Sequence, residues 1–529
     1  MIVDSGMAAR YTEAGWWSDR SLSDMIREHA SSRPDAPAYI EPGRTTTWAR
    51  YDARGDAVAA ALVRAGVAPG DRVALLLPDS ADFHVALLGT ERAAAVAVGI
   101  GSRAGDAEIA HLVRRTGART LVTLAEHRGR DMAGLPAALR EQGATGLVTH
   151  LVLDDLNDRA EPVTGRRIGP NDLWLLNSTS GTTGLPKCVT QYQNRWMYFS
   201  RLAFEAAGLG PDDVFFGAVP APFGFGIWTA HVAPTMLGAP VVVLPAFSAD
   251  EMIRMIERER ATVLCAVSTQ FRMLLKSPLA GTADLSSLRA LFTGGEAIPY
   301  ESAAEFEERT GAVVLNFFGS NESGAFSHTS RHDTREQRLR TGGRVIPEMD
   351  VRLYDDEGRD ITGTGGPGQP GGLGPLLSAG YYDDEEANAQ LYTEDGHLLM
   401  GDLVTIDADG YLRLVGRKSD IIIRGGKNIS AAEVEEAVGT HPAVRLVAVV
   451  PVPDELYGER ACAVVSLLPG ADLTLEALAG HLLGRGVSKE LLPEHLLILD
   501  ELPQSSGAKI AKGQVRDLAV EAVRSRQNG

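Results

Sequence analysis

Two stretches of the chain alternate short apolar runs with longer helical segments, and this alternation restricts the possible folds more than any other feature. The apolar runs are 72–77, 95–100 and 119–123 in the first stretch and 241–244, 262–267 and 290–292 in the second. Helical segments lie between them, and an alanine-rich one at 57–65, which ends at Gly66, precedes the first run. Because parallel strands need crossover connections, the alternation predicts an α/β protein whose sheets are covered by helices on both faces.

Length, charge and cysteine content exclude several classes of protein. A chain of 529 residues is too long for one compact core, so we expect two or more domains. A net charge of -18 without a basic cluster argues against nucleic acid or an anionic membrane as a partner. Cys188, Cys265 and Cys462 lie far apart and match neither a metal site nor a disulfide framework. With no signal peptide and no long apolar run, a cytoplasmic protein is expected.

The segment after Arg417 has a pattern of its own. A strand-like run begins at Asp420, and Ser430 followed by Glu433 predicts a capped helix start. Strand-like runs at 444–451 and 461–467 and a helical segment from Leu473 follow. These elements predict a smaller α+β domain of about 110 residues. We therefore expect a large domain at 1–417 and a small one at 418–529.

A cluster of glycines and prolines lies between residues 355 and 380. Such clusters are more often turn-rich surface connections than nucleotide loops, so we assign no ligand role to this one.

The segment 179–187, Thr-Ser-Gly-Thr-Thr-Gly-Leu-Pro-Lys, combines hydroxyl groups, flexible backbone and a cation. Glycines let the main chain approach a polyanion, hydroxyls donate to phosphate oxygens, and Lys187 brings positive charge. The candidate phosphate-binding residues are Thr179, Ser180, Gly181, Thr182, Thr183, Gly184 and Lys187. A Walker-type loop is disfavoured, because Leu185 and Pro186 separate the glycine from the lysine and Cys188 follows it. A solvent-exposed linker remains the alternative for the loop taken alone.

Four further segments follow this loop in the chain. They are Gly294–Ala297, Phe318–Glu322, the set Gly401-Asp402, Gly410-Tyr411 and Gly416-Arg417, and Pro503–Lys509. In this order the five segments resemble the motifs of the adenylate-forming superfamily, which comprises acyl- and aryl-CoA synthetases, adenylation domains and luciferase-type enzymes. The resemblance covers the chain from about residue 20 and is greatest to acyl-CoA synthetases. It implies a large domain of doubly wound mixed sheets with a small β subdomain, and a small mobile C-terminal domain.

The resemblance assigns the catalytic roles. Lys509 corresponds to the lysine that neutralises charge developing between the carboxylate and the α-phosphate of ATP. Glu322 corresponds to the Mg²⁺ ligand, and Lys187 belongs to the loop that holds the β- and γ-phosphates. Asp402 corresponds to the acceptor for the ribose hydroxyls, and Arg417 to an arginine that contacts ribose or phosphate. Lys512, one turn beyond Lys509, is the alternative to it.

The resemblance also implies the adenine contacts. Phe318 corresponds to the ring that stacks on adenine, and Gly295, Glu296 and Ala297 to the turn at its other edge. Gly319 and Ser320 complete the motif, and Asn321 stands where the family usually has Thr, with an amide that can still donate to a phosphate oxygen. Met400 replaces the Thr that typically precedes Gly401.

The acid pocket is expected around residues 223–228, Phe-Gly-Phe-Gly-Ile-Trp. Its candidate lining residues are Phe223, Phe225, Trp196 and Gly294, which predict an apolar or aromatic pocket. Trp196 and Phe199 have an equally good interpretation as plain core residues. The aspartate that amino-acid-activating relatives use to bind an α-ammonium group is not evident here, so an α-amino acid substrate is disfavoured.

The acyl acceptor is inferred from Gly425 and Gly426, which resemble a tight loop lining a pantetheine tunnel. This favours coenzyme A, although the phosphopantetheine of a carrier protein would use the same tunnel. We expect activation of a hydrophobic or aromatic carboxylic acid to acyl-AMP with ATP and Mg²⁺, and then transfer to CoA. The alternatives are a stand-alone adenylating enzyme that passes acyl-AMP to a carrier protein or separate partner, and a degenerate member retained for protein interaction.

Overall fold

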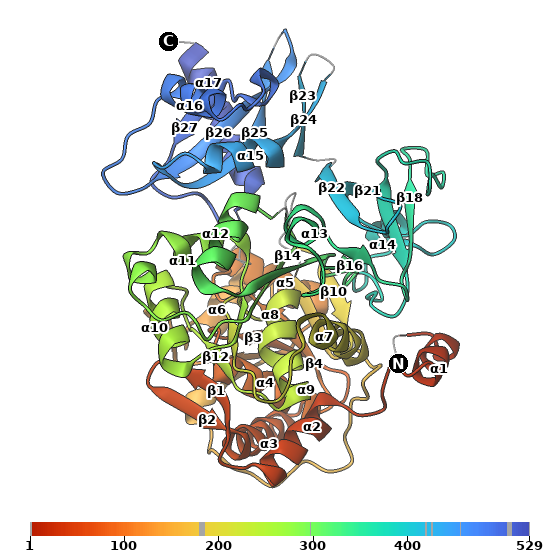
Figure 1. Ribbon diagram of the computed structural model, residues 1–529. Coiled ribbons are helices and arrows are strands. Elements are labelled where there is room, and N and C mark those ends of the chain that lie inside the picture. The colour runs from red at the N-terminus through yellow and green to blue at the C-terminus, as the bar shows by residue number, and fades with distance from the viewer. Residues whose placement is uncertain are drawn as a thin grey trace.

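A computed structural model of the 529-residue chain shows two unequal parts (Figure 1). It describes residues 3–178, 186–296, 298–417, 420–424, 427–454, 456–504 and 510–527. The large part contains two sheets and most of the helices, with a small group of strands at its side. The small C-terminal part lies at one end of it. The predicted mixed α/β fold with a larger N-terminal and a smaller C-terminal domain is confirmed.

The first sheet of the large part has six strands in the order β10-β9-β4-β3-β5-β8. Their bounds are β3 (Arg72–Leu76), β4 (Val96–Ile100), β5 (Thr120–Thr123), β8 (Thr149–Val152), β9 (Leu175–Ser178) and β10 (Cys188–Gln191). All neighbouring strands are parallel except β9 and β10, which form an antiparallel pair with Ser178 opposite Cys188. The phosphate-binding segment predicted at 179–187 therefore connects these two strands. A separate two-stranded ribbon is formed by β6 (Glu126–His127) and β7 (Arg130–Asp131).

The second sheet has nine strands in the order β17-β16-β15-β14-β13-β11-β12-β1-β2. Their bounds are β1 (Pro37–Glu41), β2 (Arg44–Thr47), β11 (Phe215–Gly217), β12 (Val241–Val243), β13 (Val263–Cys265), β14 (Ala290–Gly294), β15 (Val313–Phe318), β16 (Ser327–His328) and β17 (Arg344–Val345). The six central strands are parallel, and the edge strands β2, β16 and β17 are antiparallel to their neighbours. The sequence prediction of largely parallel sheets is confirmed.

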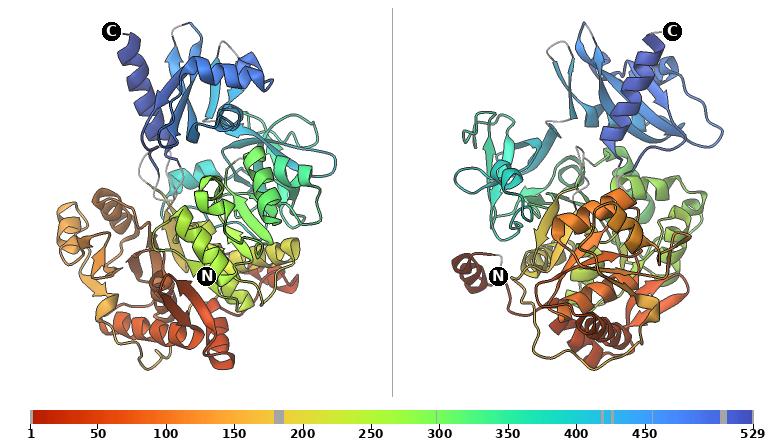
Figure 2. Two further views of the ribbon diagram at one scale, coloured as in Figure 1. Left: turned by 60° about the vertical axis from the view of Figure 1, so that its left-hand side comes forward. Right: turned by 180° about the vertical axis from the view of Figure 1, so that it is seen from behind.

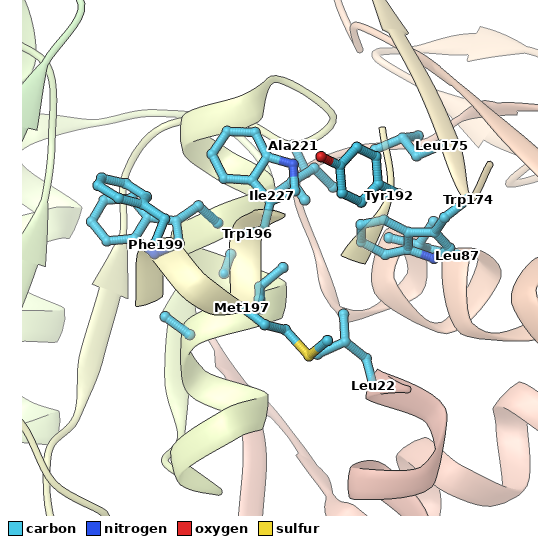
Figure 3. Packing of buried hydrophobic residues seen from close by; sticks show 14 of the residues in the cluster. Leu22, Leu87, Trp174, Leu175, Tyr192, Trp196, Met197, Phe199, Ala221 and Ile227 are labelled. Carbon is cyan, nitrogen blue, oxygen red and sulfur yellow. The ribbon is translucent and has the colours of Figure 1, made fainter. Parts of the chain in front are cut away.

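Helices pack against these sheets. Their bounds are α1 (Ser5–Glu13), α2 (Leu22–Ser32), α3 (Trp48–Arg64), α4 (Ala81–Arg92), α5 (Asp106–Thr116), α6 (Leu135–Glu141), α7 (Gln193–Ala207), α8 (Gly224–Ile227), α9 (Ala233–Leu237), α10 (Ala249–Glu259), α11 (Ser268–Lys276), α12 (Tyr300–Thr310), α13 (Arg335–Arg340) and α14 (Glu385–Leu391), with a π-helical turn at Trp228–Val232. Glycines let α3 and α4 approach closely, since a Cβ on Gly89 would lie 2.5 Å from Val58 Cβ. Figure 3 shows that side chains of α7, among them Trp196, Met197 and Phe199, lie in the main hydrophobic core of the large part.

One of the strands at the side of the large part lies in the Gly/Pro cluster, for which the sequence predicted a surface connection. β18 (Asp350–Tyr354), β19 (Gln369–Leu373) and β20 (Leu398–Leu399) form a three-stranded sheet, and β21 (Asp402–Ile406) pairs with β22 (Leu412–Arg417). The second half of the Gly/Pro cluster is thus the central strand β19 and not a surface connection. Gly371 and Gly372 are required there, since Cβ atoms would lie 2.7 Å from the Tyr354 ring and 2.3 Å from the Phe326 ring.

The C-terminal part is a sheet covered by helices, as the sequence predicted (Figure 2). Its elements are β23 (Ile421–Arg424), β24 (Lys427–Ser430), β25 (Val444–Asp454), β26 (Gly458–Leu467), β27 (His495–Ile498), α15 (Ala431–Gly439), α16 (Leu475–Gly484) and α17 (Lys512–Gln527). Ser430 is the N-cap of α15, but its side chain accepts no capping hydrogen bond. The predicted N-cap position is therefore confirmed, but the side-chain cap expected with Glu433 does not form, and Ser430 also ends the strand β24.

The described contacts that join the two parts include three polar ones. Lys276 Nζ donates to the carbonyl oxygen of Val444, and Arg485 lies 3.6 Å from the Glu301 carboxylate. Arg103 donates to Gln504 Oε1 at 3.0 Å, directly before the segment that carries Lys509. Within the described residues, no helix combines the length and the apolar character needed to cross a membrane.

Candidate active site

Most of the predicted phosphate loop, Thr179, Ser180, Gly181, Thr182, Thr183 and Gly184, lies outside the described residues. The two strands that flank it are described, and they place its two ends side by side at one edge of the six-stranded sheet. At the end of this segment, Lys187 Nζ lies 4.8 Å from the centroid of the Tyr381 ring. A cation at this distance from an aromatic face is attracted by the ring, so Tyr381 gives Lys187 a preferred position.

The motif that begins at Phe318 forms a tight turn after β15. Phe318 is buried, and a Cβ on Gly319 would lie 1.9 Å from the carbonyl oxygen of Gly324, so only glycine is compatible with this turn. The Ser320 hydroxyl accepts from the backbone N–H groups of Glu322, at 3.2 Å, and Ser323, at 3.1 Å. The motif residues therefore fix a backbone shape at the end of a parallel strand, where open α/β sheets bind ligands.

Glu322, the expected metal ligand, is oriented by Tyr381. The Tyr381 hydroxyl donates to Glu322 Oε1 at 2.8 Å, and burial raises the pKa of Tyr381, with the Glu322 carboxylate adding to the effect. The described residues contain no group of three or more His, Cys, Asp or Glu side chains that could hold a metal ion. A single half-buried carboxylate fits Mg²⁺, which binds through one or two carboxylates and otherwise uses water and substrate phosphates.

Asn321 takes part in a network of side-chain amides. Its Nδ2 donates to Asn177 Oδ1 at 2.7 Å, and Asn177 Nδ2 donates back to Asn321 Oδ1 at 3.0 Å. Gln191 Nε2 donates to the amide oxygens of both, at 2.9 Å to Asn177 and 3.2 Å to Asn321. The network joins β9 and β10, the strands that flank the phosphate loop, to the turn that carries Glu322.

A residue that the sequence analysis missed lies under this turn. Arg195 of α7 is 1% exposed, and its guanidinium donates to the carbonyl oxygens of Asn321 at 3.0 Å and Glu322 at 3.2 Å. It also donates to the carbonyl oxygen of Leu376 and to the Gln191 side chain. The only sequence signal was a charged residue directly before the apolar run Trp196–Phe199.

The two residues expected at the ribose are paired across two neighbouring strands. Asp402, at the start of β21, is paired in register with Arg417, the last residue of β22. Met400 is buried two residues earlier, and the Ser323 hydroxyl donates to its sulfur at 3.4 Å. The described contacts therefore run without interruption from Lys187 through Tyr381 to the Glu322 turn and from there to the segment of Asp402.

The expected adenine turn follows β14. Gly295 has a φ of 75°, which favours glycine, and Ala297 lies outside the described residues. Glu296 directs its carboxylate to another element, since its Oε1 accepts from Ser268 N at 2.7 Å at the start of α11. The Glu296 side chain therefore supports the α11 N-terminus, where negative charge is favourable.

The residues predicted to line the acid pocket lie beside this turn. Phe225 stacks on Trp228 with centroids 5.7 Å apart and meets Phe317 edge to face at 5.1 Å. A Cβ on Gly224 would lie 2.5 Å from Asn321 Oδ1, so the segment of Phe223 and Phe225 touches the Glu322 turn. Gly294 packs on Phe317 in the same way, with a Cβ 2.7 Å from its carbonyl oxygen.

Trp196 belongs to the core and to the site at once. It is 5% exposed, as a core residue would be, yet its Nε1 donates to Gln191 Oε1 at 2.9 Å and its ring lies 3.0 Å from a Cβ on Gly224. Phe199 is a core residue, packed against Trp228 with centroids 4.6 Å apart.

The small domain presents Lys512 in an ion cluster. Lys512 Nζ lies 3.1 Å from Asp420 and 2.9 Å from Glu435. Although burial acts to lower it, the two carboxylates raise the pKa of Lys512. A lysine held by two carboxylates of its own domain is poorly suited to neutralise a substrate, which leaves Lys509 as the candidate. Lys509, Gly425 and Gly426 lie outside the described residues.

Comparison with known proteins decides the family. Residues 26–382 match the AMP-binding enzyme family, and residues 433–509 match the AMP-binding enzyme C-terminal domain. The chain belongs to the AMP-binding enzyme family. It is therefore an adenylate-forming enzyme, as the order of its motifs predicted.

Three similar proteins show the range of activities in this family of AMP-binding enzymes. The medium-chain fatty-acid–CoA ligase of Escherichia coli (strain K12) is 30% identical over 96% of this chain and 92% of its own length. A salicyl-AMP ligase / salicyl-S-ArCP synthetase of Mycobacterium tuberculosis is 32% identical over 97% of this chain and 93% of its own. The crystal structure of an anthranilate CoA ligase with anthranoyl-AMP has a TM-score of 0.86 at 24% identity and covers 96% of this chain and 98% of that one.

Proposed function

We propose that this AMP-binding enzyme activates a hydrophobic or aromatic carboxylic acid with ATP and then transfers the acyl group to coenzyme A. The observation that carries the proposal is the continuous set of contacts from Lys187 through Tyr381 and Glu322 to Met400 and the Asp402 segment. It brings the described parts of three family motifs to one place beside the aromatic residues around Phe225. Fatty-acid and aryl-acid ligases among the similar proteins support an apolar acid.

The proposed chemistry divides among these residues. Glu322 would hold Mg²⁺, which would offset the negative charge of the phosphates. Asp402 and Arg417, as cross-strand neighbours, would bind the ribose and a phosphate, and Phe318 the adenine. The loop ending at Lys187 would hold the leaving pyrophosphate. Lys509 would stabilise the charge that develops as the carboxylate attacks the α-phosphorus.

The second half-reaction needs a thiol acceptor. We propose coenzyme A, with Gly425 and Gly426 leaving room for its pantetheine arm. The alternative, transfer to a carrier protein, is favoured by one similar protein whose name includes a salicyl-S-ArCP synthetase activity. For both acceptors we propose a cytoplasmic enzyme with its domain boundary at Arg417, and a rotation of the small domain between the half-reactions.

Pyrophosphate release with a panel of carboxylic acids, ATP and Mg²⁺ tests the first half-reaction. Acids that stabilise the protein against heat only together with ATP and Mg²⁺ would identify the panel members to pursue. Acyl-CoA formation with the accepted acid tests the second half-reaction. Pyrophosphate release without any thioester would favour the carrier-protein alternative, and no release with any acid would contradict the proposal.

A further inference from the structure

Arg195 is a buried cation whose partners are neutral. Its guanidinium donates to three backbone carbonyl oxygens, those of Leu376, Asn321 and Glu322, and to the Gln191 side chain. Its carbon Cζ lies 4.8 Å from the centre of the Trp196 ring. Among the described residues, no carboxylate lies within ion-pair distance of it. The positive charge is therefore solvated by dipoles and remains without a contacting counterion.

The large domain contains a second buried arginine, and its partners are carboxylates. Arg92 of α4 is equally buried, with a side chain 5% exposed, and it forms ion pairs with Asp52 at 2.5 Å and Asp56 at 3.0 Å. Burial of an unpaired charge is costly, so buried arginines normally have such carboxylate partners. Arg195 differs from Arg92 because its donors are directed to carbonyl and amide oxygens instead of carboxylates.

A carboxylate that acts electrostatically on Arg195 without forming an ion pair with it is that of Glu322. Burial lowers the pKa of Arg195 to about 10, while the negative charge of Glu322 acts to raise it, so the side chain stays charged at neutral pH. The backbone of Glu322 is held by Arg195 on one side, and its carboxylate by the Tyr381 hydroxyl on the other. Two independent contacts thus fix the direction in which the carboxylate points.

We propose that Arg195 is a positioning residue for the metal-binding turn: its guanidinium holds the carbonyl groups of Asn321 and Glu322, and its charge is balanced by Glu322 and the bound polyphosphate. A planar guanidinium suits this role because it can hold two neighbouring carbonyl oxygens at fixed directions, which an ammonium group cannot. The proposal rests on the proposed function, in which Glu322 binds Mg²⁺ with ATP.

The test measures how much Mg²⁺ improves ATP binding without any acid present. Calorimetric titration gives the ratio of the dissociation constant in EDTA to that in excess Mg²⁺ for the wild type and for Arg195→Met, Arg195→Lys and Arg92→Met. We expect Arg195→Met to lower this ratio about tenfold and Arg195→Lys about threefold, since hydrogen bonds from a charged donor are among the stronger ones. Arg92→Met should lower the melting temperature and leave the ratio unchanged.

The outcomes separate this inference from the proposed function. A wild-type ratio in Arg195→Met, with or without a lower melting temperature, would overturn the positioning role. Should Arg195→Met not fold, a wild-type ratio in Arg195→Lys would overturn it equally, because lysine cannot reproduce the two-carbonyl contact. A wild-type protein that binds ATP neither with nor without Mg²⁺ would contradict the proposed function itself.

Discussion

Arg195 in the large domain is a buried cation and Lys512 in the small domain a half-buried one, and the groups that hold them differ. Arg195 is held by carbonyl and amide oxygens, whereas Lys512 is held by the carboxylates of Asp420 and Glu435. Lys512 is thus neutralised within its own domain, and its charge has little influence beyond the cluster. The charge of Arg195 is not cancelled locally, so it adds to the positive potential at the turn where a polyphosphate is expected.

The largest expected effect separates Lys509 from Lys512. Lys509→Ala should reduce pyrophosphate release about 10²- to 10³-fold, as removal of a group that stabilises developing charge typically does. Lys512→Met should instead cost about 3 kcal/mol of folding free energy, because it leaves two carboxylates without their cation. Pyrophosphate release per folded molecule and thermal unfolding of both variants are the measurements. Near wild-type release in Lys509→Ala, with loss in folded Lys512→Met, would reverse the assignment.

The next effect distinguishes the metal side of the site from the ribose side. Asp402→Asn should weaken ATP binding by about 1.5 to 3 kcal/mol for each charged hydrogen bond lost, with an unchanged Mg²⁺ midpoint. Glu322→Gln should raise the Mg²⁺ concentration needed for half-maximal pyrophosphate release. Titrations of ATP at fixed Mg²⁺ and of Mg²⁺ at fixed ATP measure the two constants. If both variants gave the same pair of curves, the division of roles would be wrong.

A buried carboxyl group without a cation sharpens the comparison with Arg195. Burial raises the pKa of Asp79 to about 8, and its only described hydrogen bond comes from Ala221 N at 3.2 Å. Unlike an arginine, Asp79 can escape the cost of burial by binding a proton. Its contribution to stability is complete below the unfolded pKa and is lost as the pH rises through about 8.

Asp79→Asn should remove this pH dependence. Relative to the variant, the wild type should lose about 1.4 kcal/mol of unfolding free energy between pH 6 and pH 7. Urea unfolding of both proteins at the two pH values measures the difference. Parallel pH profiles would show that Asp79 is ionised in the folded protein.

The smallest effect concerns the second contact of Glu322. Tyr381→Phe removes the hydroxyl that donates to the carboxylate at 2.8 Å and keeps the ring beneath Lys187. Loss of one hydrogen bond of about 1 kcal/mol should raise the Mg²⁺ midpoint about fivefold. Tyr392→Phe, which removes a nearby hydroxyl that does not touch Glu322, is the control. An equal shift in both variants would argue against a specific role of Tyr381.

Much of the large domain could be predicted because its strands are continuous apolar runs bounded by turn residues. β3, β5 and β12 lie within a residue or two of where the sequence places them. β19 could not be found this way, because the glycines that exclude it by local propensity are required by the Tyr354 and Phe326 rings, which come from elsewhere in the chain.

The residues of the site also divide into those that a local sequence motif predicts and those that it does not. The order of the motifs predicted the family and the neighbourhood of Glu322, Asp402 and Phe225. Arg195 and the amides of Asn177 and Gln191 carry no local pattern, because their importance arises only when three segments distant in the sequence meet. Glu296 was correctly placed in a turn, but the direction of its side chain toward α11 depends on tertiary packing.

In a chimeric enzyme, the network formed by the Arg195 guanidinium and the amides of Asn177, Gln191 and Asn321 should come from one parent. Relatives at about 30% identity align with nearly the whole chain, so recombination between them is practicable. A crossover between residues 196 and 320 would take Arg195 and Gln191 from one parent and Asn321 from the other, and would leave donors and acceptors unmatched in the core. Crossovers before Asn177 or after Leu376 keep the network within one parent, and these positions should give the folded hybrids.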